Sequence, residues 1–265
     1  SARPVWASAE AFSTLGSALS GAGVQEALAR LSLFEGENNA RAAVLDVSGG
    51  YAYIGLCVSP GRVVKIRLSD FTRVDTLNFN EGQNCPQVGL LDAANGMAYF
   101  GLSTTPSQVV KVRLSDFTQV GALSLEGEKG LYAGALDGAG GFAYFATWQG
   151  SGLSARLVKV RLSDFTRAST LTLGAGQLSV LSATIDSLNG YLYLGMDSNN
   201  VVKVRLSDFS QVGSLDFWGY GSGVRSIAVD PAGGYLYLGL SGTKGAVVRI
   251  QLSDFSVKDG IQFNS

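Results

Sequence analysis

Five glutamates could supply paired carboxylates for acid-base catalysis. They fall in segments that join successive repeats and that are expected to meet on one face: Glu35, Glu37, Glu81, Glu126 and Glu128. Paired carboxylates serve as acid and base in glycosidases and lyases. The chain has no histidine, which removes Ser-His-Asp, Cys-His and His-metal chemistry. A histidine-free carboxylate enzyme is therefore the least favoured of three hypotheses.

Aromatic residues in variable segments offer chemistry for binding. The segment 147–156 is the longest of its kind, and a second segment carries aromatics between glycines. Aromatic rings stack on sugars or anchor a protein partner, and polar neighbours add hydrogen bonds. The alternative is that these rings fold back onto the domain. The candidate binding residues are Trp148, Gln149, Arg156, Trp218 and Tyr220.

Charge and hydropathy exclude several partners. The net charge is −1 and the basic residues are spread along the chain, so the basic patch that nucleic acid requires is missing. No apolar run approaches the roughly 18 residues of a membrane span, and we expect no membrane insertion. The glycine motifs that cradle nucleotides are also missing. We therefore expect no cofactor and no metal.

Two cysteines give an indication of where in or outside the cell the protein is located. Cys57 ends an expected strand and Cys85 lies in the following inter-repeat segment, so both are expected on the same face. We predict a disulfide between them, with two reduced thiols as the alternative. A disulfide is typical of an oxidising compartment, which indicates a secreted or cell-surface protein.

An internal repeat organises the chain. The word Leu-Ser-Asp-Phe recurs five times, with spacings of 46, 48, 44 and 46 residues between its aspartates: Asp70, Asp116, Asp164, Asp208 and Asp254. Serine and aspartate at a strand exit accept hydrogen bonds from backbone N–H groups two residues on. These aspartates are accordingly interpreted as structural turn residues.

Each copy contains four strand signals. In the second copy the strands are expected at 88–91, 97–102, 109–114 and 120–125. A four-stranded unit of this size cannot bury both faces alone, whereas successive units packed around an axis cover one another. The sequence therefore predicts an all-β fold, a β-propeller with five recognisable blades.

The third strand of most copies carries a lysine and an arginine two residues apart, as at Lys65 and Arg67. This spacing places both side chains on one face of the strand. The planar guanidinium suits a carboxylate, so we expect repeated ion pairs between strands or between blades. A polyanion-binding ring is the alternative.

The repeat resembles the short-repeat propellers of the NHL and YVTN types. The resemblance rests on units such as Gly-Tyr-Leu-Tyr-Leu-Gly at 190–195 followed by Val-Val-Lys-Val-Arg-Leu at 201–206, and it covers residues 41–263. It implies a fold and no particular activity, because that group contains enzymes, receptors and scaffolds.

The first forty residues lie outside the repeat. We predict two parts, an N-terminal extension at 1–40 and a propeller domain at 41–265. The segment Leu31-Ser32-Leu33 resembles the fourth strand Leu123-Ser124-Leu125 and is interpreted as an outer strand of a sixth blade, while Val24, Leu28 and Leu31 have helical spacing. Both interpretations stay open.

Three functions follow from these patterns. The leading hypothesis is a non-catalytic interaction or structural module with a protein partner or self-assembly, based on low charge, a mean hydropathy of +0.20 and the regular repeat. A carbohydrate-binding propeller is the second hypothesis, and the carboxylate enzyme is the third.

Overall fold

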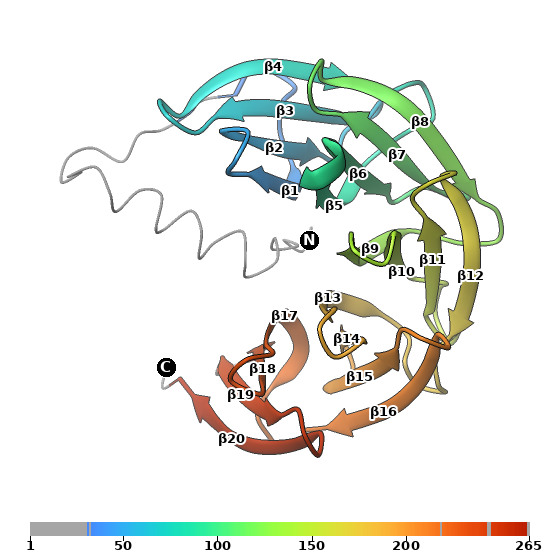
Figure 1. Cartoon of the computed structure of the whole chain (residues 1–265), viewed down its shortest axis with the longest axis vertical. Helices are drawn as coiled ribbons and strands as arrows, with labels where there is room; N and C mark the ends of the chain where they lie inside the picture. The colour runs from blue at the N-terminus through green and yellow to red at the C-terminus, as the bar shows by residue number, and fades with distance from the viewer. Residues whose placement is uncertain (1–30, 32, 218, 243–244, 264–265) are drawn as a thin grey trace. The chain divides into compact units, whose positions relative to one another are not determined.

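The computed structural model describes residue 31 and the ranges 33–217, 219–242 and 245–263. In this described part the strands form five four-stranded antiparallel sheets, and each sheet follows chain order (Figure 1). We call these sheets blades one to five. The chain divides into two compact units, Ser1–Glu126 with blades one and two, and Gly127–Ser265 with blades three to five.

The first unit contains eight strands and the short 3-10 helix η1 (Ala93–Asn95), which joins β5 to β6. Blade one consists of β1 (Ala40–Asp46), β2 (Tyr51–Leu56), β3 (Arg62–Arg67) and β4 (Thr72–Asn78). Blade two consists of β5 (Pro86–Asp92), β6 (Met97–Leu102), β7 (Ser107–Arg113) and β8 (Thr118–Leu125).

The second unit contains twelve strands. Blade three consists of β9 (Leu131–Asp137), β10 (Phe142–Thr147), β11 (Arg156–Arg161) and β12 (Thr166–Thr172). Blade four consists of β13 (Val180–Asp186), β14 (Tyr191–Met196), β15 (Asn200–Arg205) and β16 (Ser210–Asp216). Blade five consists of β17 (Ser222–Asp230), β18 (Tyr235–Ser241), β19 (Ala246–Gln251) and β20 (Ser256–Gln262).

The predicted all-β fold with four strands per repeat is confirmed. In the second repeat all four expected strands overlap the observed ones, and β6 has the expected bounds. Strand β7 begins two residues before the expected 109 and ends one residue before the expected 114. Ladder pairing extends to Ser107 and Gln108, because main-chain hydrogen bonds continue beyond the apolar core that defines the sequence signal.

The second and third strands of a blade share one aromatic face. Tyr53 lies opposite Lys65 in the β2–β3 ladder, and the Lys65 Nζ stands 4.1 Å from the ring centre of Tyr51. The equivalent ammonium groups stand 4.0 Å from Phe142 and 4.0 Å from Tyr191 in blades three and four. Burial lowers the pKa of Lys159 and Lys203. These lysines therefore belong to the packing between blades.

Each Leu-Ser-Asp-Phe turn is held by its aspartate. Asp70 Oδ1 accepts hydrogen bonds from the Thr72 amide at 3.2 Å and the Thr72 hydroxyl at 2.7 Å. Its Oδ2 lies 2.9 Å from Arg67 Nη1. The same arginine pairing recurs at Asp116, Asp164 and Asp208.

The two residues of each of these ion pairs are three apart in sequence and lie in one turn. The pairs are therefore formed within a blade, whereas the sequence also allowed pairs between blades. Blade five is the exception. It carries Gln251 at the arginine position, and its Arg249 pairs with Asp259 of the adjacent strand, Nη2 to Oδ2 at 2.5 Å.

The last residue of the turn has an unusual backbone. Phe71, Phe117, Phe165, Phe209 and Phe255 all have φ between 52° and 54°, a region that non-glycine residues rarely occupy. The conformation turns the ring away from its own blade. Within each unit the ring reaches the preceding blade: the Phe117 and Tyr53 ring centres are 5.5 Å apart, and those of Phe209 and Tyr144 are 5.8 Å apart.

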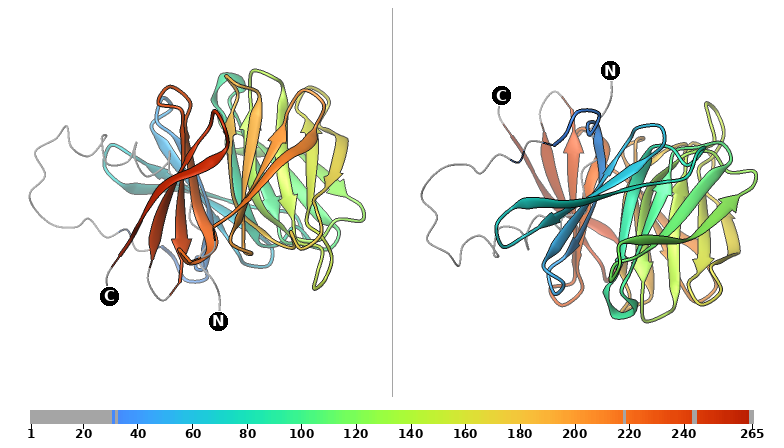
Figure 2. Two further views of the ribbon diagram at one scale, coloured as in Figure 1. Left: turned by 90° about the horizontal axis from the view of Figure 1, so that it is seen from below. Right: turned by 90° about the horizontal axis from the view of Figure 1, so that it is seen from above.

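Apolar side chains fill the space between successive blades of one unit. Blade one packs on blade two through residues such as Val63, Phe79 and Phe100. Blades three to five pack in the same manner through two further clusters. Figure 2 shows the twist of blade five, coloured red, which is the usual twist of β-sheets. Among the described residues, no helix has the length and apolarity needed to cross a membrane.

The start of the described chain covers part of blade one. Leu31 and Leu33 form neither strand nor helix, and they pack against a cluster that contains Ala52, Leu56 and Val64. Their side chains thus take an apolar role, although the residues described there do not pair as a strand. Of the residues with helical spacing, Val24 and Leu28 lie outside the described residues.

Candidate interaction site

The loop between β10 and β11 presents the candidate interaction site. It spans residues 148–155, close to the variable segment singled out in the sequence. The Trp148 side chain is 42% exposed, and Leu153 is also exposed. The Tyr132 ring meets the Trp148 ring edge-on, with centres 6.5 Å apart. We call these three residues the Trp148 surface.

Hydrogen bonds fix both ends of this loop. The Trp148 amide donates to the carbonyl oxygens of Lys129 and Gly130 at 3.1 and 3.0 Å. At the other end, the Ala155 amide donates to the Gln177 carbonyl at 2.7 Å. The Thr147 hydroxyl oxygen accepts from the Arg156 amide at 3.2 Å. The exposed indole is therefore carried by an anchored backbone, which lowers the entropy cost of binding.

A buried carboxylate lies in the segment that supports the loop. Glu128 is fully buried, and its Oε1 lies 3.1 Å from Arg156 Nη1 and 3.5 Å from Arg167 Nη1. Its Oε2 accepts a hydrogen bond from Gln149 Nε2 at 2.5 Å. A buried charge is tolerated only with such partners. Gln149 and Arg156 are thus engaged with Glu128.

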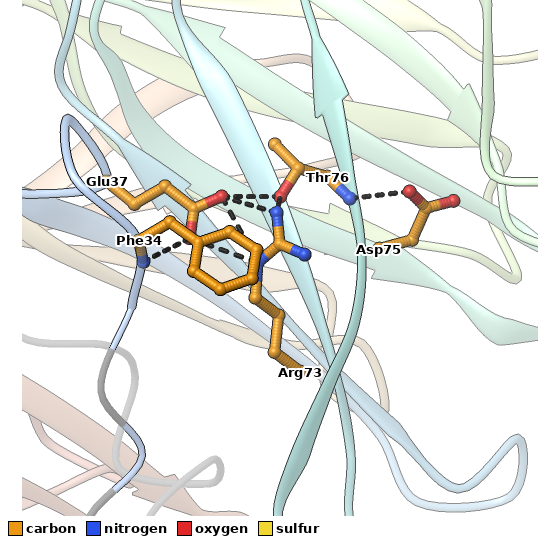
Figure 3. Close-up of polar contacts among 5 residues, drawn as sticks. All are labelled: Phe34, Glu37, Arg73, Asp75 and Thr76. Carbon is orange, nitrogen blue, oxygen red and sulfur yellow. Dashed lines mark hydrogen bonds and ion pairs between the residues drawn. The ribbon is translucent and has the colours of Figure 1, made fainter.

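Blade one contains the same arrangement (Figure 3). Arg73 Nη2 lies 2.6 Å from Glu37 Oε1, and the Thr76 hydroxyl donates to the same oxygen at 2.7 Å. Glu37 Oε2 accepts from the Phe34 amide at 3.0 Å, while the Phe34 ring covers the Arg73 guanidinium at 4.1 Å. The hydrogen bond from Arg73 lowers the pKa of Glu37 to about 2.

The residue at the position of Glu37 and the residue at the position of Arg73 change together from blade to blade. Blades one and three carry glutamate after the turn glycine and arginine two residues after the Leu-Ser-Asp-Phe phenylalanine, whereas blades two and four carry glutamine at both places. In blade four the Gly174 amide donates to Gln177 Oε1 at 2.8 Å and to Gln211 Oε1 at 3.2 Å. Charge is thus matched with charge, and amide with amide.

The glutamates proposed for catalysis divide into two groups. Glu37 and Glu128 are buried, and each is paired with arginine, Glu37 with Arg73 and Glu128 with Arg156 and Arg167. Glu35, Glu81 and Glu126 are exposed beside the turn glycines. The paired residues show what the sequence interpretation missed. The signal was available, because Gly-Glu or Gly-Gln precedes the first strand in each of blades one to four.

The aromatics of the second candidate segment lie elsewhere. Tyr220 packs in the apolar cluster of blade five and covers Gly260, where an added Cβ would lie 2.5 Å from Tyr220 Cε1. Trp218 lies outside the described residues. Of the four predicted binding residues that the structure describes, Trp148 is thus the one that presents a large exposed aromatic surface.

Cys57 and Cys85 form a disulfide that joins the end of β2 to the segment before β5. The bond ties blade one to blade two within the first unit. Among the described residues, no cluster of three or more potential metal-ligating side chains is present. Asp197, part of a short polar loop, faces Arg225 at 3.6 Å.

Repeated four-stranded blades of this kind define a β-propeller. Solved structures of the same fold include U3-55K, with a TM-score of 0.70 at 9% identity over 88% of this chain and 66% of that one. The Pan2 WD40 domain of Neurospora crassa gives a TM-score of 0.67 at 12% identity, over 86% and 67%. Kuenenia stuttgartiensis hydrazine synthase gives 0.59 at 14% identity, over 68% and 49%.

The chain therefore spans between about half and two thirds of the length of these structures. No protein-family model and no curated protein sequence matches the chain. At such low identities the likeness establishes the propeller fold alone, and WD40 propellers are among the structures that share it. The resemblance to the NHL and YVTN types stays a prediction.

Proposed function

We propose that this chain is a non-catalytic interaction module that binds a protein partner through the Trp148 surface. The observation that carries the proposal is a large exposed indole on a loop anchored at both ends. Such rigid, amphipathic aromatics supply much of the binding energy in protein interfaces. Propeller scaffolds of the WD40 type are commonly protein-interaction modules, which favours the same function.

The role of the two buried glutamates supports a non-catalytic assignment. A general acid or base must reach the substrate with its carboxylate. Glu37 and Glu128 instead direct their oxygens to arginine, glutamine and backbone groups of their own blade. These contacts hold the adjoining loops in place, and in the case of Glu128 this is the loop that carries Trp148.

Photo-crosslinking tests the proposed protein partner. Leu153 is replaced by a photoreactive phenylalanine derivative, and the protein is irradiated in extracts of its natural source. We expect one discrete adduct that disappears when Trp148→Ala is added. Leu188, an exposed leucine in a turn of blade four, provides the control position. Equal adducts from both positions, or an adduct that survives Trp148→Ala, would contradict the proposal.

Carbohydrate binding is a second candidate for the same surface. It is favoured by the exposed Trp148 indole with the Tyr132 ring at its edge, since stacked sugars need an accessible aromatic face. Trp218 and Tyr220 belong to the same hypothesis. A glycan array probed with wild type and Trp148→Ala tests it. A blank array with folded wild-type protein would remove this candidate.

A secreted or cell-surface location forms part of the proposal. The Cys57–Cys85 disulfide supports it, because structural disulfides persist mainly in oxidising compartments. Alkylation of intact source cells with a membrane-impermeant reagent, before and after reduction, tests the location. Labelling that requires both reduction and cell lysis would count against it.

A further inference from the structure

The junctions between blades follow a common design. The phenylalanine of one Leu-Ser-Asp-Phe turn enters a cradle on the preceding blade, which is formed by a second-strand tyrosine and the third-strand lysine opposite it. Phe255 stands 6.1 Å from Tyr193 and 5.4 Å from Lys203 Nζ. Phe117 and Phe209 occupy the equivalent cradles of blades one and three.

Blade five has an equivalent cradle, and among the described residues no turn phenylalanine lies against it. Tyr237 lies opposite Arg249 in the β18–β19 ladder, and Arg249 covers the Tyr235 ring at 4.6 Å. Tyr237 is 37% exposed, whereas the equivalent Tyr193 of blade four is 1% exposed. Arginine stacks on aromatic rings at least as well as lysine. The cradle is therefore complete in chemistry and open to solvent.

The exposed area continues along the last strand. Ile261 lies opposite Val247 in the β19–β20 ladder, on the same face as Tyr237. Ile261 is 67% exposed and Phe263 is 55% exposed. Phe217, which has the position of Phe263 in blade four, is buried. We call Tyr237, Arg249, Ile261 and Phe263 the open cradle, an apolar patch of the kind that marks an interaction surface.

Blade one carries a phenylalanine turn of the matching shape. Phe71 has φ 53°, close to the values of 52° and 54° for Phe117 and Phe209, which are received by a preceding blade. Phe71 is nevertheless 41% exposed, whereas Phe117 is 6% exposed. Leu31 and Leu33 cover part of the face of blade one opposite its own cradle, while the Phe71 ring stays exposed.

We propose that copies of this chain associate head to tail, with Phe71 of one copy entering the open cradle of the next. The three filled cradles, which carry lysine at the position of Arg249, show that a ring in this conformation fits against a tyrosine and a cation. Asp259 does not obstruct the fit, since Asp75 has the equivalent position in blade one, where Phe117 is received.

Two different surfaces meet in this contact, so the association is heterologous and extends beyond a dimer. The contact is centred on one aromatic side chain and its rim, which is small for a stable interface. The association is therefore weak and depends on concentration, with a dissociation constant on the order of 0.1 mM. It is independent of the Trp148 surface, and Trp148→Ala leaves it unchanged.

A mixing experiment tests the proposal. Phe71→Asn removes the ring and suits the positive φ, because asparagine tolerates that region. Tyr237→Thr removes one wall of the cradle and keeps strand propensity. Sedimentation equilibrium on the full chain up to about 1 mM, near ten times the expected dissociation constant, should show wild type rising above 27.6 kDa while each variant alone stays monomeric.

An equimolar mixture of the two variants provides the decisive measurement. Each mixture retains one intact ring and one intact cradle, so it should reach about twice 27.6 kDa and stop there. Leu188→Asn, at an exposed turn residue, is the control and should behave as wild type. Monomeric wild type at all concentrations, or variants that associate as wild type does, would overturn the proposal. A Phe71→Cys/Tyr237→Cys cross-link confined to single chains would also overturn it.

Discussion

The Glu37 carboxylate is 2.6 Å from the Arg73 guanidinium, and the Phe34 ring covers the other side of that guanidinium at 4.1 Å. One side chain from the segment before blade one is thereby joined to the last strand of the same blade. The pair connects the start of the described chain to the outermost strand of the sheet, in addition to the packing of Leu31 and Leu33 on the same blade.

Acid should weaken this connection in a defined pH range. Arg73 holds the pKa of Glu37 at about 2, below its ordinary value of 4.5. A carboxyl group with a lowered pKa stabilises the folded state above the unfolded-state value, and this stability is lost as the pH falls from about 4.5 towards 2. Urea unfolding between pH 7 and pH 2.5 should show this loss in wild type. Glu37→Gln should remove that part of the pH dependence, and an unchanged profile would contradict the assignment.

The buried network of blade three allows a rescue experiment. Glu128→Gln leaves Arg156 and Arg167 facing a neutral group, and we expect a loss of about 2 kcal/mol in the free energy of unfolding. Adding Arg167→Gln recreates the amide pairing of blade four and should recover part of that loss. Denaturant unfolding of both single variants and the double variant measures the coupling. Purely additive losses would show that the two positions do not act as a pair.

The fold was predictable because five copies of the repeat show the same pattern of strands and turns. Residues such as Asp70 and Arg67 recur at fixed spacing, and strand period and turn chemistry followed directly. The role of Phe71 and its equivalents was not predictable, since the sequence does not show a positive φ at a phenylalanine. The aspartate of each turn holds the turn itself, whereas the ring beside it makes the contact between blades.

The candidate site was predictable in part. Variation in loop length identified the segment of Trp148, because that loop departs from the repeat. Gln149 and Arg156 are candidate binding residues on sequence grounds, yet their side chains contact the buried Glu128. Pairing in three dimensions decided their role, and it becomes visible in the sequence only when glutamate-arginine and glutamine-glutamine positions are compared between blades.

The phenylalanine turns provide a matched pair of stability measurements. Phe117→Ala removes a buried ring from the cradle of Tyr53 and Lys65, and we expect a loss of about 3 kcal/mol. Phe71→Ala alters the same turn where the ring is 41% exposed, so the expected loss is below about 1 kcal/mol in the monomer. Chemical denaturation at low protein concentration compares them. Equal losses would mean that the turn, and not the cradle, determines the stability.

The Cys57–Cys85 disulfide should stabilise the first unit. The two cysteines are 28 residues apart in sequence, and closing a loop of that length restricts the unfolded chain by about 3 kcal/mol. The adjacent backbone is also paired, since the Cys57 amide donates to Asn39 and the Cys85 amide to Val58. A Cys57→Ser/Cys85→Ser variant should therefore unfold at a lower denaturant concentration than oxidised wild type. Wild type treated with a reductant is the control and should shift by a similar amount. If all three samples unfold together, the disulfide contributes nothing to stability and its role must be sought in oxidation chemistry.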